Sequence, residues 1–386
     1  MSDSPTAFTG FGTATREILG RLARRPGFQV ASIGWGYDGW PYDRSQIPYD
    51  IYPSRGQPFG KDAAARAIAE MHPDVLVSFG DLWMIDWIRE LPRDAGCRSL
   101  IYFPIDGEPF PRAWREVVHT ADVAVAYSRY GQRVTAEACP GVEVEMIYHG
   151  VDRSVFRPLP DRDAVRRRHR LDGKLVVGCV ARNQPRKMFP ILLKAFSRFC
   201  RERDDAMLYL HTDPHDIGWD ILDLVRRYGL SDRTCITRQA SVDRGVPPEI
   251  LNEIYNLFDV FALPTAAEGF GLPIVEAMAA GVPVVVTDYS ACTELVEGRG
   301  ELLAVQRLLT IGRYNLEQAL VGEDDLVRKL TLLYDDPELR HRHRHAGLEF
   351  TKQLDWDLLA DQWVELLYRR IGNVPRTEPQ VPAHAE

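Results

Sequence analysis

The chain of 386 residues is long enough for two domains, each able to bury a sizeable core. Its apolar fraction of 45% and charged fraction of 26% are typical of a globular protein, and its net charge of -8 argues against a general nucleic-acid binder, which would carry a basic excess. The six cysteines are scattered without a CxxC pair, which predicts reduced, mostly buried thiols. The sequence shows no apolar run of membrane-spanning length and no signal peptide, so we expect a cytoplasmic protein.

The chain opens with residues 1–8, which show no strand pattern, and continues with a glycine hinge and an amphipathic helix between Thr9 and Arg25. In phosphate-binding α/β folds, a buried strand precedes such a hinge. We therefore expect that the first strand of the N-terminal sheet is missing, through truncation or a misassigned start. The arginines of the helix leave two interpretations open: weak peripheral contact with an anionic membrane, or complementation of the helix dipole.

Short apolar runs then alternate with helical patterns in two successive arrays. The runs of the first array are 28–35, 74–80, 99–104, 122–128 and 142–148, and those of the second are 174–182, 206–212, 234–239, 259–265 and 282–288. Such alternation predicts parallel sheets covered on both faces, with a ligand cleft at the carboxyl ends of their strands. We expect an N-terminal Rossmann-like domain at 1-152, a C-terminal one at 153-350, an amphipathic helix at 351-371 and a disordered tail at 372-386.

Two further segments have alternative interpretations. The segment 34–60 is crowded with aromatic side chains, which either form a platform for an acceptor sugar or anchor a long loop. These are Trp35, Tyr37, Trp40, Tyr42, Tyr49 and Tyr52. The run from His341 to His345 looks like a metal site, but alternate residues do not share a helix face. We therefore predict a solvated helix there, and no metal site.

A loop with three cations follows the first apolar run of the second array. The strand ends at Ala181 and delivers Arg182, Arg186 and Lys187 toward the expected cleft. Fixed positive charge at this position suits the stabilisation of a leaving diphosphate. We assign that role to Arg182 and Lys187, and expect Lys187 to be a surface loop cation. Arg186 fits this role and a solvated position equally well.

The most informative segment, "EGFGLPIVEAMAAGVPVV", places two carboxylates beside a helix N-terminus. A helix is predicted from Leu272 or Pro273 to just before Gly281, with Glu268 in the preceding loop and Glu276 about one turn into the helix. The free N–H groups at its start can hold an anion or sugar hydroxyls. Electrostatic capping is the alternative, which the neighbouring cationic loop makes the weaker interpretation.

Together these residues resemble a known family. The segment just quoted, the loop "ARNQPRK" and the connection "YHGVDRSVFRP" are similar to the retaining nucleotide-sugar glycosyltransferases of family 4, over residues 9–365 and most strongly over 147–303. The resemblance implies an α/β chain with the GT-B fold: two doubly wound Rossmann-like domains face a cleft, and a C-terminal helix crosses back to the N-terminal domain. It also implies that no cofactor and no metal is needed, because protein cations replace Mg²⁺.

The resemblance also implies roles by position. Arg182 and Lys187 would bind the donor diphosphate and stabilise it as it leaves, Glu268 would hold the hydroxyls of the donor sugar, and Glu276 would accept hydrogen bonds from the ribose. The backbone of three residues would assist Glu268: Phe270, Gly271 and Leu272. The base would be contacted around residues 237–240.

Two departures from the family pattern concern the N-terminal half. Many members carry a histidine near the donor sugar, and this chain has Asp106 in about that place, either as a ligand of a sugar hydroxyl or as a turn residue. Many members have two adjacent glycines in the opening loop, where this chain has Thr9 and Gly10. Gly10 is the residue for which we expect a close approach of the backbone to the donor phosphates.

The predicted function is transfer of a hexose-type sugar, with retention, from a nucleoside diphosphate sugar to a hydroxyl of a saccharide, lipid or small-molecule acceptor. No nucleic-acid partner is predicted, because the net charge argues against a general nucleic-acid binder, although a local basic surface remains possible. The predicted location is cytoplasmic, with peripheral contact at the inner membrane face left open. Two alternatives remain: another GT-B enzyme, such as an epimerase or phosphorylase, and a non-catalytic protein that binds sugar nucleotides. The joint presence of Arg182, Lys187, Glu268 and Glu276 argues against the second.

Overall fold

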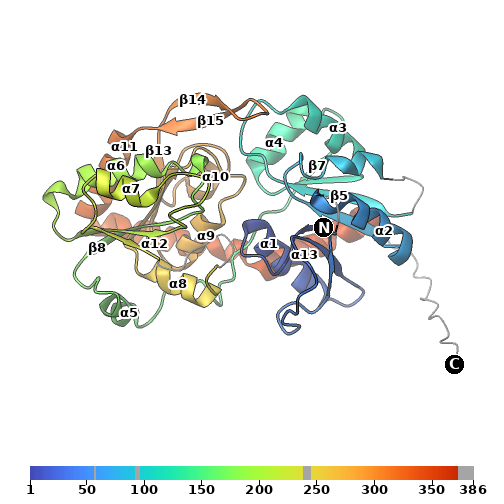
Figure 1. The fold of residues 1–386 in the computed structure, drawn as a ribbon, viewed down its shortest axis with the longest axis horizontal. Coiled ribbons are helices and arrows are strands. Elements are labelled where there is room, and N and C mark those ends of the chain that lie inside the picture. Colours follow the sequence, from blue (N-terminus) through green and yellow to red (C-terminus); the bar gives the residue numbers. More distant parts are fainter. Residues whose placement is uncertain (56–57, 92–95, 238–244, 373–386) are drawn as a thin grey trace.

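The computed structural model describes residues 1–55, 58–91, 96–237 and 245–372. The chain forms two lobes that lie side by side, each with a parallel sheet flanked by helices (Figure 1). We refer to residues 1–148 as the N-terminal lobe and to residues 152–354 as the C-terminal lobe. Residues 373–386 of the predicted tail and residues 238–240 of the predicted base contacts lie outside the described residues.

The N-terminal lobe is built on parallel strands in the order β3-β2-β1 and β4-β5-β6-β7. The strands are β1 (Ser2–Asp3), β2 (Ala31–Trp35), β3 (Asp50–Pro53), β4 (Val75–Phe79), β5 (Arg98–Phe103), β6 (Val123–Ala126) and β7 (Val144–Met146). The helices are α1 (Gly10–Leu22), α2 (Lys61–Met71), α3 (Arg112–Thr120) and α4 (Arg129–Ala138). Each apolar run of the first predicted array therefore contains a strand.

The expectation of a missing first strand is wrong. Ser2 and Asp3 pair in parallel with Gly34 and Trp35 of β2, and the Met1 carbonyl accepts a hydrogen bond of 2.8 Å from the Phe79 N–H at the end of β4. The first residues thus fill the position between β2 and β4 in the middle of the sheet. The sequence hides this strand because it is two residues long and polar, and its backbone rather than its side chains provides the pairing.

The C-terminal lobe has a six-stranded parallel sheet in the order β10-β9-β8-β11-β12-β13. The strands are β8 (Leu175–Val180), β9 (Ala206–His211), β10 (Thr234–Ile236), β11 (Val260–Leu263), β12 (Val284–Thr287) and β13 (Glu301–Leu303). The helices are α5 (Arg162–Arg168), α6 (Phe189–Phe199), α7 (Ile221–Arg227), α8 (Pro248–Asn256), α9 (Leu272–Ala279), α10 (Ala291–Val296), α11 (Glu323–Asp335) and α12 (Pro337–Thr351). β8, β11 and β12 are buried along their whole length, as the continuous apolar runs predict for a sheet covered on both faces.

The last helix, α13 (Trp356–Ile371), crosses back to the N-terminal lobe and lies against α1 (Figure 1). Arg21 of α1 forms an ion pair of 2.6 Å with Asp357, and Arg25 pairs with Asp361. The predicted crossing helix is therefore confirmed. Two of the arginines for which a membrane contact or the helix dipole was considered, Arg21 and Arg25, thus pair with carboxylates of α13.

A hairpin that the sequence did not predict joins the lobes on another side. β14 (Val305–Ile311) and β15 (Leu316–Val321) are antiparallel, and their tip reaches the N-terminal lobe (Figure 1). There Leu316 is buried in the core of that lobe, Tyr314 packs against Trp114 with ring centroids 5.1 Å apart, and the Glu317 N–H donates to the Glu108 carbonyl.

Candidate active site

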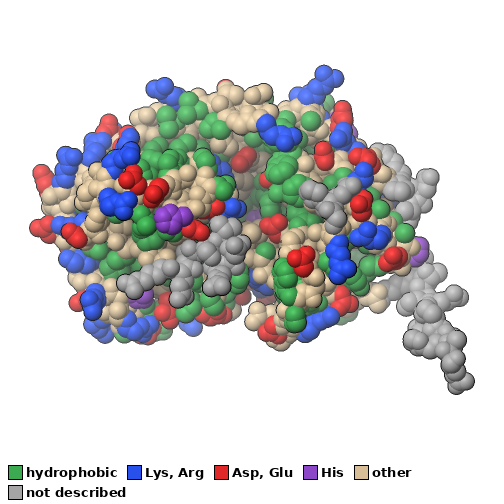
Figure 2. All heavy atoms as spheres, in the orientation of Figure 1, with side chains coloured by type: hydrophobic (Ala, Val, Ile, Leu, Met, Phe, Trp, Pro, Cys, Tyr) green, Lys and Arg blue, Asp and Glu red, His purple; other side chains and the backbone are tan. Residues whose placement is uncertain are grey.

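A cleft of about 1800 Å³ lies between the lobes, at the carboxyl ends of both sheets. The space-filling view shows the surface hollowed between the two halves (Figure 2). Every residue assigned to the site from the sequence lines this cleft. These residues are Gly10, Asp106, Arg182, Lys187, Glu268, Phe270, Gly271, Leu272 and Glu276. Topology explains this, because parallel strands of both lobes end at the same space.

Glu268 is the centre of a buried ionic cluster. Its carboxylate binds Lys187 Nζ at 2.5 Å and Arg186 Nη1 at 2.9 Å, and the side chains of Glu268 and Lys187 are only 5% and 7% exposed. Burial alone would raise the pKa of Glu268, but the charges of Arg186 and Lys187 lower it to about 2. The carboxylate is therefore ionised at neutral pH and held in a fixed orientation.

The structure corrects the expected exposure of Lys187 and places Arg186, for which two positions were considered. Lys187 is not a surface cation, because the 3-10 turn Pro185–Lys187 directs its side chain inward, and burial lowers its pKa. Arg186, which sequence analysis left open, lines the cleft, pairs with Glu268 and donates to the Ala267 carbonyl at 2.8 Å. All three cations of the loop thus lie at the cleft.

Arg182 lies at the outer part of the same loop. Its side chain is 45% exposed and binds Asp216 through Nε at 2.7 Å and through Nη2 at 3.2 Å. Asp216 follows β9, and no pattern in the sequence marks it as a site residue. Its position is set by the tertiary fold.

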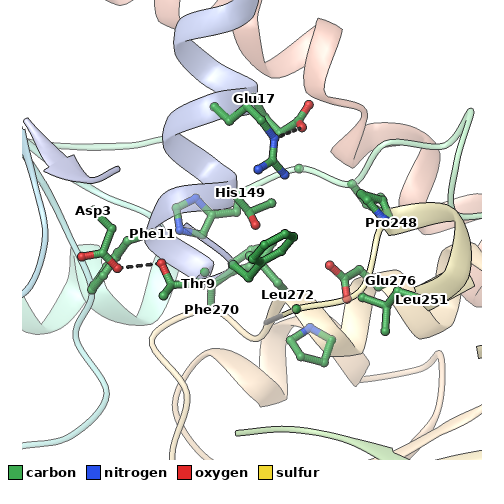
Figure 3. Close-up of a pocket in the computed structure, with 18 of the residues that line it drawn as sticks. Asp3, Thr9, Phe11, Glu17, His149, Pro248, Leu251, Phe270, Leu272 and Glu276 are labelled. Carbon is green, nitrogen blue, oxygen red and sulfur yellow. Dashed lines mark hydrogen bonds and ion pairs between the residues drawn. The ribbon is translucent and has the colours of Figure 1, made fainter. Parts of the chain in front are cut away.

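The helix α9 presents its N-terminus to the cleft, as predicted. Gly271 has a φ of 105°, a conformation that favours glycine, and Pro273 occupies the first turn. Glu276 accepts a hydrogen bond of 2.7 Å from the Tyr255 hydroxyl, and burial raises its pKa to about 7. Figure 3 shows Glu276 on one wall of the pocket, with Phe270 between it and the Asp3–Thr9 pair.

The N-terminal lobe adds carboxylates to the cleft. Asp106 follows β5, and burial raises its pKa while the charge of Arg186 opposes this shift. Asp81, which was not predicted from the sequence, follows β4 in the same way and also lines the cleft. Burial and the neighbouring Asp106 raise its pKa to about 7. Its place directly after a predicted strand was the available signal.

The sequence did not mark His149 as a site residue either, although it lies in the connection "YHGVDRSVFRP". It lines the cleft, its Nδ1 lies 2.9 Å from the Tyr102 hydroxyl, and its ring stacks on Tyr127 at a centroid distance of 4.2 Å. Burial lowers its pKa to about 3, so the ring is neutral. It also contacts Phe270 across the pocket, with ring centroids 5.2 Å apart (Figure 3).

The opening glycines lie in the first turn of α1, and Thr9 caps that helix by accepting from the Gly12 N–H. A Cβ on Gly10 would meet only Leu272 Cδ1, at an ordinary 3.7 Å, whereas a Cβ on Gly12 would lie 2.6 Å from the Ala7 carbonyl oxygen. Gly12, and not Gly10, is therefore the position at which neighbouring backbone lies too close for a side chain. The role of Gly10 toward a donor stays a prediction.

The two segments with alternative interpretations are now placed. In the aromatic segment, Tyr37 donates to the Trp40 carbonyl at 2.6 Å and Tyr42 to the Tyr49 carbonyl at 2.9 Å, which supports the anchoring interpretation, although Tyr42 also lines the cleft. In α12, His343 binds Glu301 at 2.8 Å and is therefore not a solvated residue.

Three general features concern the residues that the structure describes. No group of three His, Cys, Asp or Glu side chains among them is arranged to hold a metal ion. No helix among them is long and apolar enough to cross a membrane. All six cysteines are free thiols and four are buried.

Comparison with known proteins places the chain among sugar-transferring enzymes. Residues 174–323 match the family described as Glycosyl transferases group 1. A GDP-mannose-dependent alpha-(1-6)-phosphatidylinositol monomannoside mannosyltransferase of Mycolicibacterium smegmatis is 31% identical over 306 residues, 74% of this chain and 78% of the relative. A D-inositol 3-phosphate glycosyltransferase of Kribbella flavida is 28% identical over 93% of this chain and 85% of the relative.

Solved structures agree on the architecture. Anabaena Alr3699/HepE in complex with UDP-glucose superimposes with a TM-score of 0.74 at 19% identity, over 95% of this chain and 98% of that one. A sucrose-phosphate synthase from Thermosynechococcus elongatus superimposes with a TM-score of 0.65 at 20% identity, over 84% of this chain and 81% of that one. These likenesses confirm the predicted GT-B fold.

Proposed function

The chain belongs to the glycosyl transferases of group 1, and we propose that it moves a hexose-type sugar from a nucleoside diphosphate sugar to an acceptor hydroxyl with retention of anomeric configuration. One observation carries this proposal. The cationic loop after β8 and the N-terminus of α9 meet at Glu268, inside a cleft between two sheets. Both elements are therefore available to one ligand that combines a diphosphate with a sugar.

The cations act on the diphosphate. Arg182 is the most exposed of the three and is free to bind phosphate oxygens along one edge of its guanidinium group. Lys187 and Arg186 provide fixed positive charge where negative charge develops as the diphosphate leaves. This charge does the work of a divalent cation, so we propose that transfer needs no metal and no cofactor.

The carboxylates bind the rest of the donor. Glu268 accepts hydrogen bonds from the sugar hydroxyls, the backbone N–H groups at the start of α9 donate to them, and Glu276 accepts from the ribose. Asp106, at the opposite wall, is free to accept from a hydroxyl of the donor sugar or the acceptor. Glu268 and the backbone N–H groups of α9 thus orient the donor sugar before reaction, while Glu276 fixes the ribose.

The names of relatives bear on the donor. One relative is described as GDP-mannose-dependent, and HepE was solved with UDP-glucose. We propose a hexose donor and use both bases in the test. For the acceptor we propose a saccharide, lipid or small molecule with a free hydroxyl, and for the protein a cytoplasmic location with or without contact to the inner membrane face.

The test measures binding first and transfer second. UDP, GDP and ADP should each be scored by the rise in melting temperature of the purified chain, since a bound nucleotide stabilises in proportion to its occupancy. Transfer from the matching sugar nucleotide is then followed with and without EDTA, and the anomeric configuration of the product is read by NMR. If the donor is isomerised in the absence of an acceptor, the protein is an epimerase. If the reaction requires inorganic phosphate, it is a phosphorylase. If the nucleotide binds but no turnover is detected, the protein is non-catalytic. An inverted product would refute retention.

A further inference from the structure

The pair formed by Arg182 and Asp216 is asymmetric in burial. The Asp216 side chain is 3% exposed, whereas the Arg182 side chain above it is 45% exposed and lines the cleft. The carboxylate binds Nε and Nη2, so it occupies one of the two edges at which a guanidinium group can make paired hydrogen bonds. No residue in the described part of the chain binds Nη1 of Arg182, so this side of the guanidinium group is left for a ligand.

Asp216 belongs to a short loop, residues 213–219, that is fixed onto the Arg182 loop. Asn183 is fully buried; its Oδ1 accepts from the Trp219 N–H at 3.0 Å, and its Nδ2 donates to the Trp219 carbonyl at 2.6 Å. A Cβ on Gly218 would lie 2.2 Å from the same Asn183 Oδ1, so the two loops are in direct contact.

The ends of this loop are also tied. The Asp213 carboxylate accepts from the His215 N–H at 2.9 Å, and the Ile221 N–H at the start of α7 donates to the Pro214 carbonyl at 3.2 Å. Asp216 is therefore held by backbone that has little freedom to move. A long arginine side chain bound to such a fixed carboxylate loses its rotamer freedom before any ligand arrives.

We propose that Asp216 is a positioning residue for the donor: it binds the Nε edge of Arg182 and thereby presents the Nη1 edge to the diphosphate. The inference rests on the proposed function, because it takes the diphosphate as the ligand of Arg182. Asp216 itself contacts no substrate. Asp3 is the other carboxylate that acts on Arg182 through its charge, and it lies on the opposite lobe.

A competing view makes Asp216 an inhibitory partner that the diphosphate must displace. The two views predict opposite effects of Asp216→Asn. If Asp216 competes with the ligand, removal of its charge strengthens diphosphate binding. If it positions Arg182, the same change weakens binding, because the guanidinium group then donates to one neutral amide oxygen in place of two oxygens of a carboxylate.

The experiment compares two probes by calorimetry: the nucleoside diphosphate that stabilises the wild-type chain most, UDP or GDP, and the matching nucleoside, which lacks phosphate. We expect Asp216→Asn to weaken diphosphate binding about tenfold and to leave nucleoside binding unchanged. In an Arg182→Ala background, Asp216→Asn should have no further effect. Asp204→Asn, which breaks an Arg233 pair with a 98% exposed carboxylate, is the matched control and should bind like wild type.

The outcomes separate the two claims. A wild-type chain that binds none of the nucleoside diphosphates overturns the proposed function and the inference with it. Wild-type binding that Asp216→Asn leaves unchanged or strengthens overturns the inference alone. An equal loss of nucleoside and diphosphate binding, or a further loss in the Arg182→Ala background, would show that the residue only supports the loop structure, and would also overturn it.

Discussion

Replacement of Lys187 by methionine tests the buried cluster most directly. The change keeps the length of the side chain and removes the cation that binds Glu268 at 2.5 Å. Among the described residues, the carboxylate of Glu268, which is 5% exposed, then keeps one cationic partner, Arg186, whose side chain is 32% exposed. Loss of a buried hydrogen bond to a charged group costs about 1.5–3 kcal/mol, so we expect a loss of ~2 kcal/mol in the free energy of unfolding at pH 7. Transfer activity should also be abolished, since Lys187 is proposed to stabilise the leaving diphosphate.

The assay is urea unfolding at pH 7 and at pH 3, with Lys352→Met as the control. Lys352 forms an exposed pair with Glu349, and its removal should cost less than ~0.5 kcal/mol. The pKa of Glu268 is depressed in the folded chain, so its contribution is complete above its ordinary pKa of 4.5 and is lost as pH falls toward about 2. The difference in the free energy of unfolding between wild type and Lys187→Met should therefore be smaller at pH 3 than at pH 7. Equal stability of the two chains at pH 7, or a difference that does not change with pH, would refute this reasoning.

Three further predictions concern the fold and the donor site. Gly12→Ala should destabilise the chain by about 1–3 kcal/mol because the new Cβ meets the backbone of Ala7, while Gly10→Ala should leave stability unchanged; urea midpoints compare the two. Leu316→Ala should cost ~2 kcal/mol by the same measurement because this side chain is buried in the core of the N-terminal lobe, whereas Leu308→Ala, at a position 44% exposed, should cost little. Since the Glu276 carboxyl titrates near pH 7 and is proposed to accept from the ribose, binding of UDP or GDP should strengthen several-fold from pH 6 to pH 8, and Glu276→Gln should flatten that profile; a pH profile that stays the same in the variant would contradict this role.

The sequence was sufficient wherever side-chain pattern and local geometry decide the structure. Ten apolar runs marked ten of the parallel strands, and Pro273 with Gly281 bracketed α9. Because parallel strands with right-handed crossovers bring their carboxyl ends to one edge, the residues after those strands could be placed at a cleft in advance. This is why Arg182, Asp106 and Glu268 lie there, whereas Gly10 reaches the cleft through β1, a strand that the sequence did not predict.

The sequence was insufficient to predict structure that depends on backbone pairing or on partners far away in the chain. The pairing of β1 depends on backbone groups of Gly34 and Phe79, and the hairpin β14–β15 gains its buried contacts from the other lobe through Leu316. The sequence also marked Lys187 as exposed, since a cation after a strand is ordinarily solvated. Its partner Glu268 stands 81 residues away, and only the folded chain brings the two together.

The sequence by itself thus determined the architecture, the cleft and the types of residue that line it, because periodicity and helix termini are local properties. The tertiary structure alone decided which charges are paired: Lys187 and Arg186 with Glu268, and Arg182 with Asp216. These pairings set burial, protonation and orientation, and they depend on distances between loops that no spacing along the chain encodes.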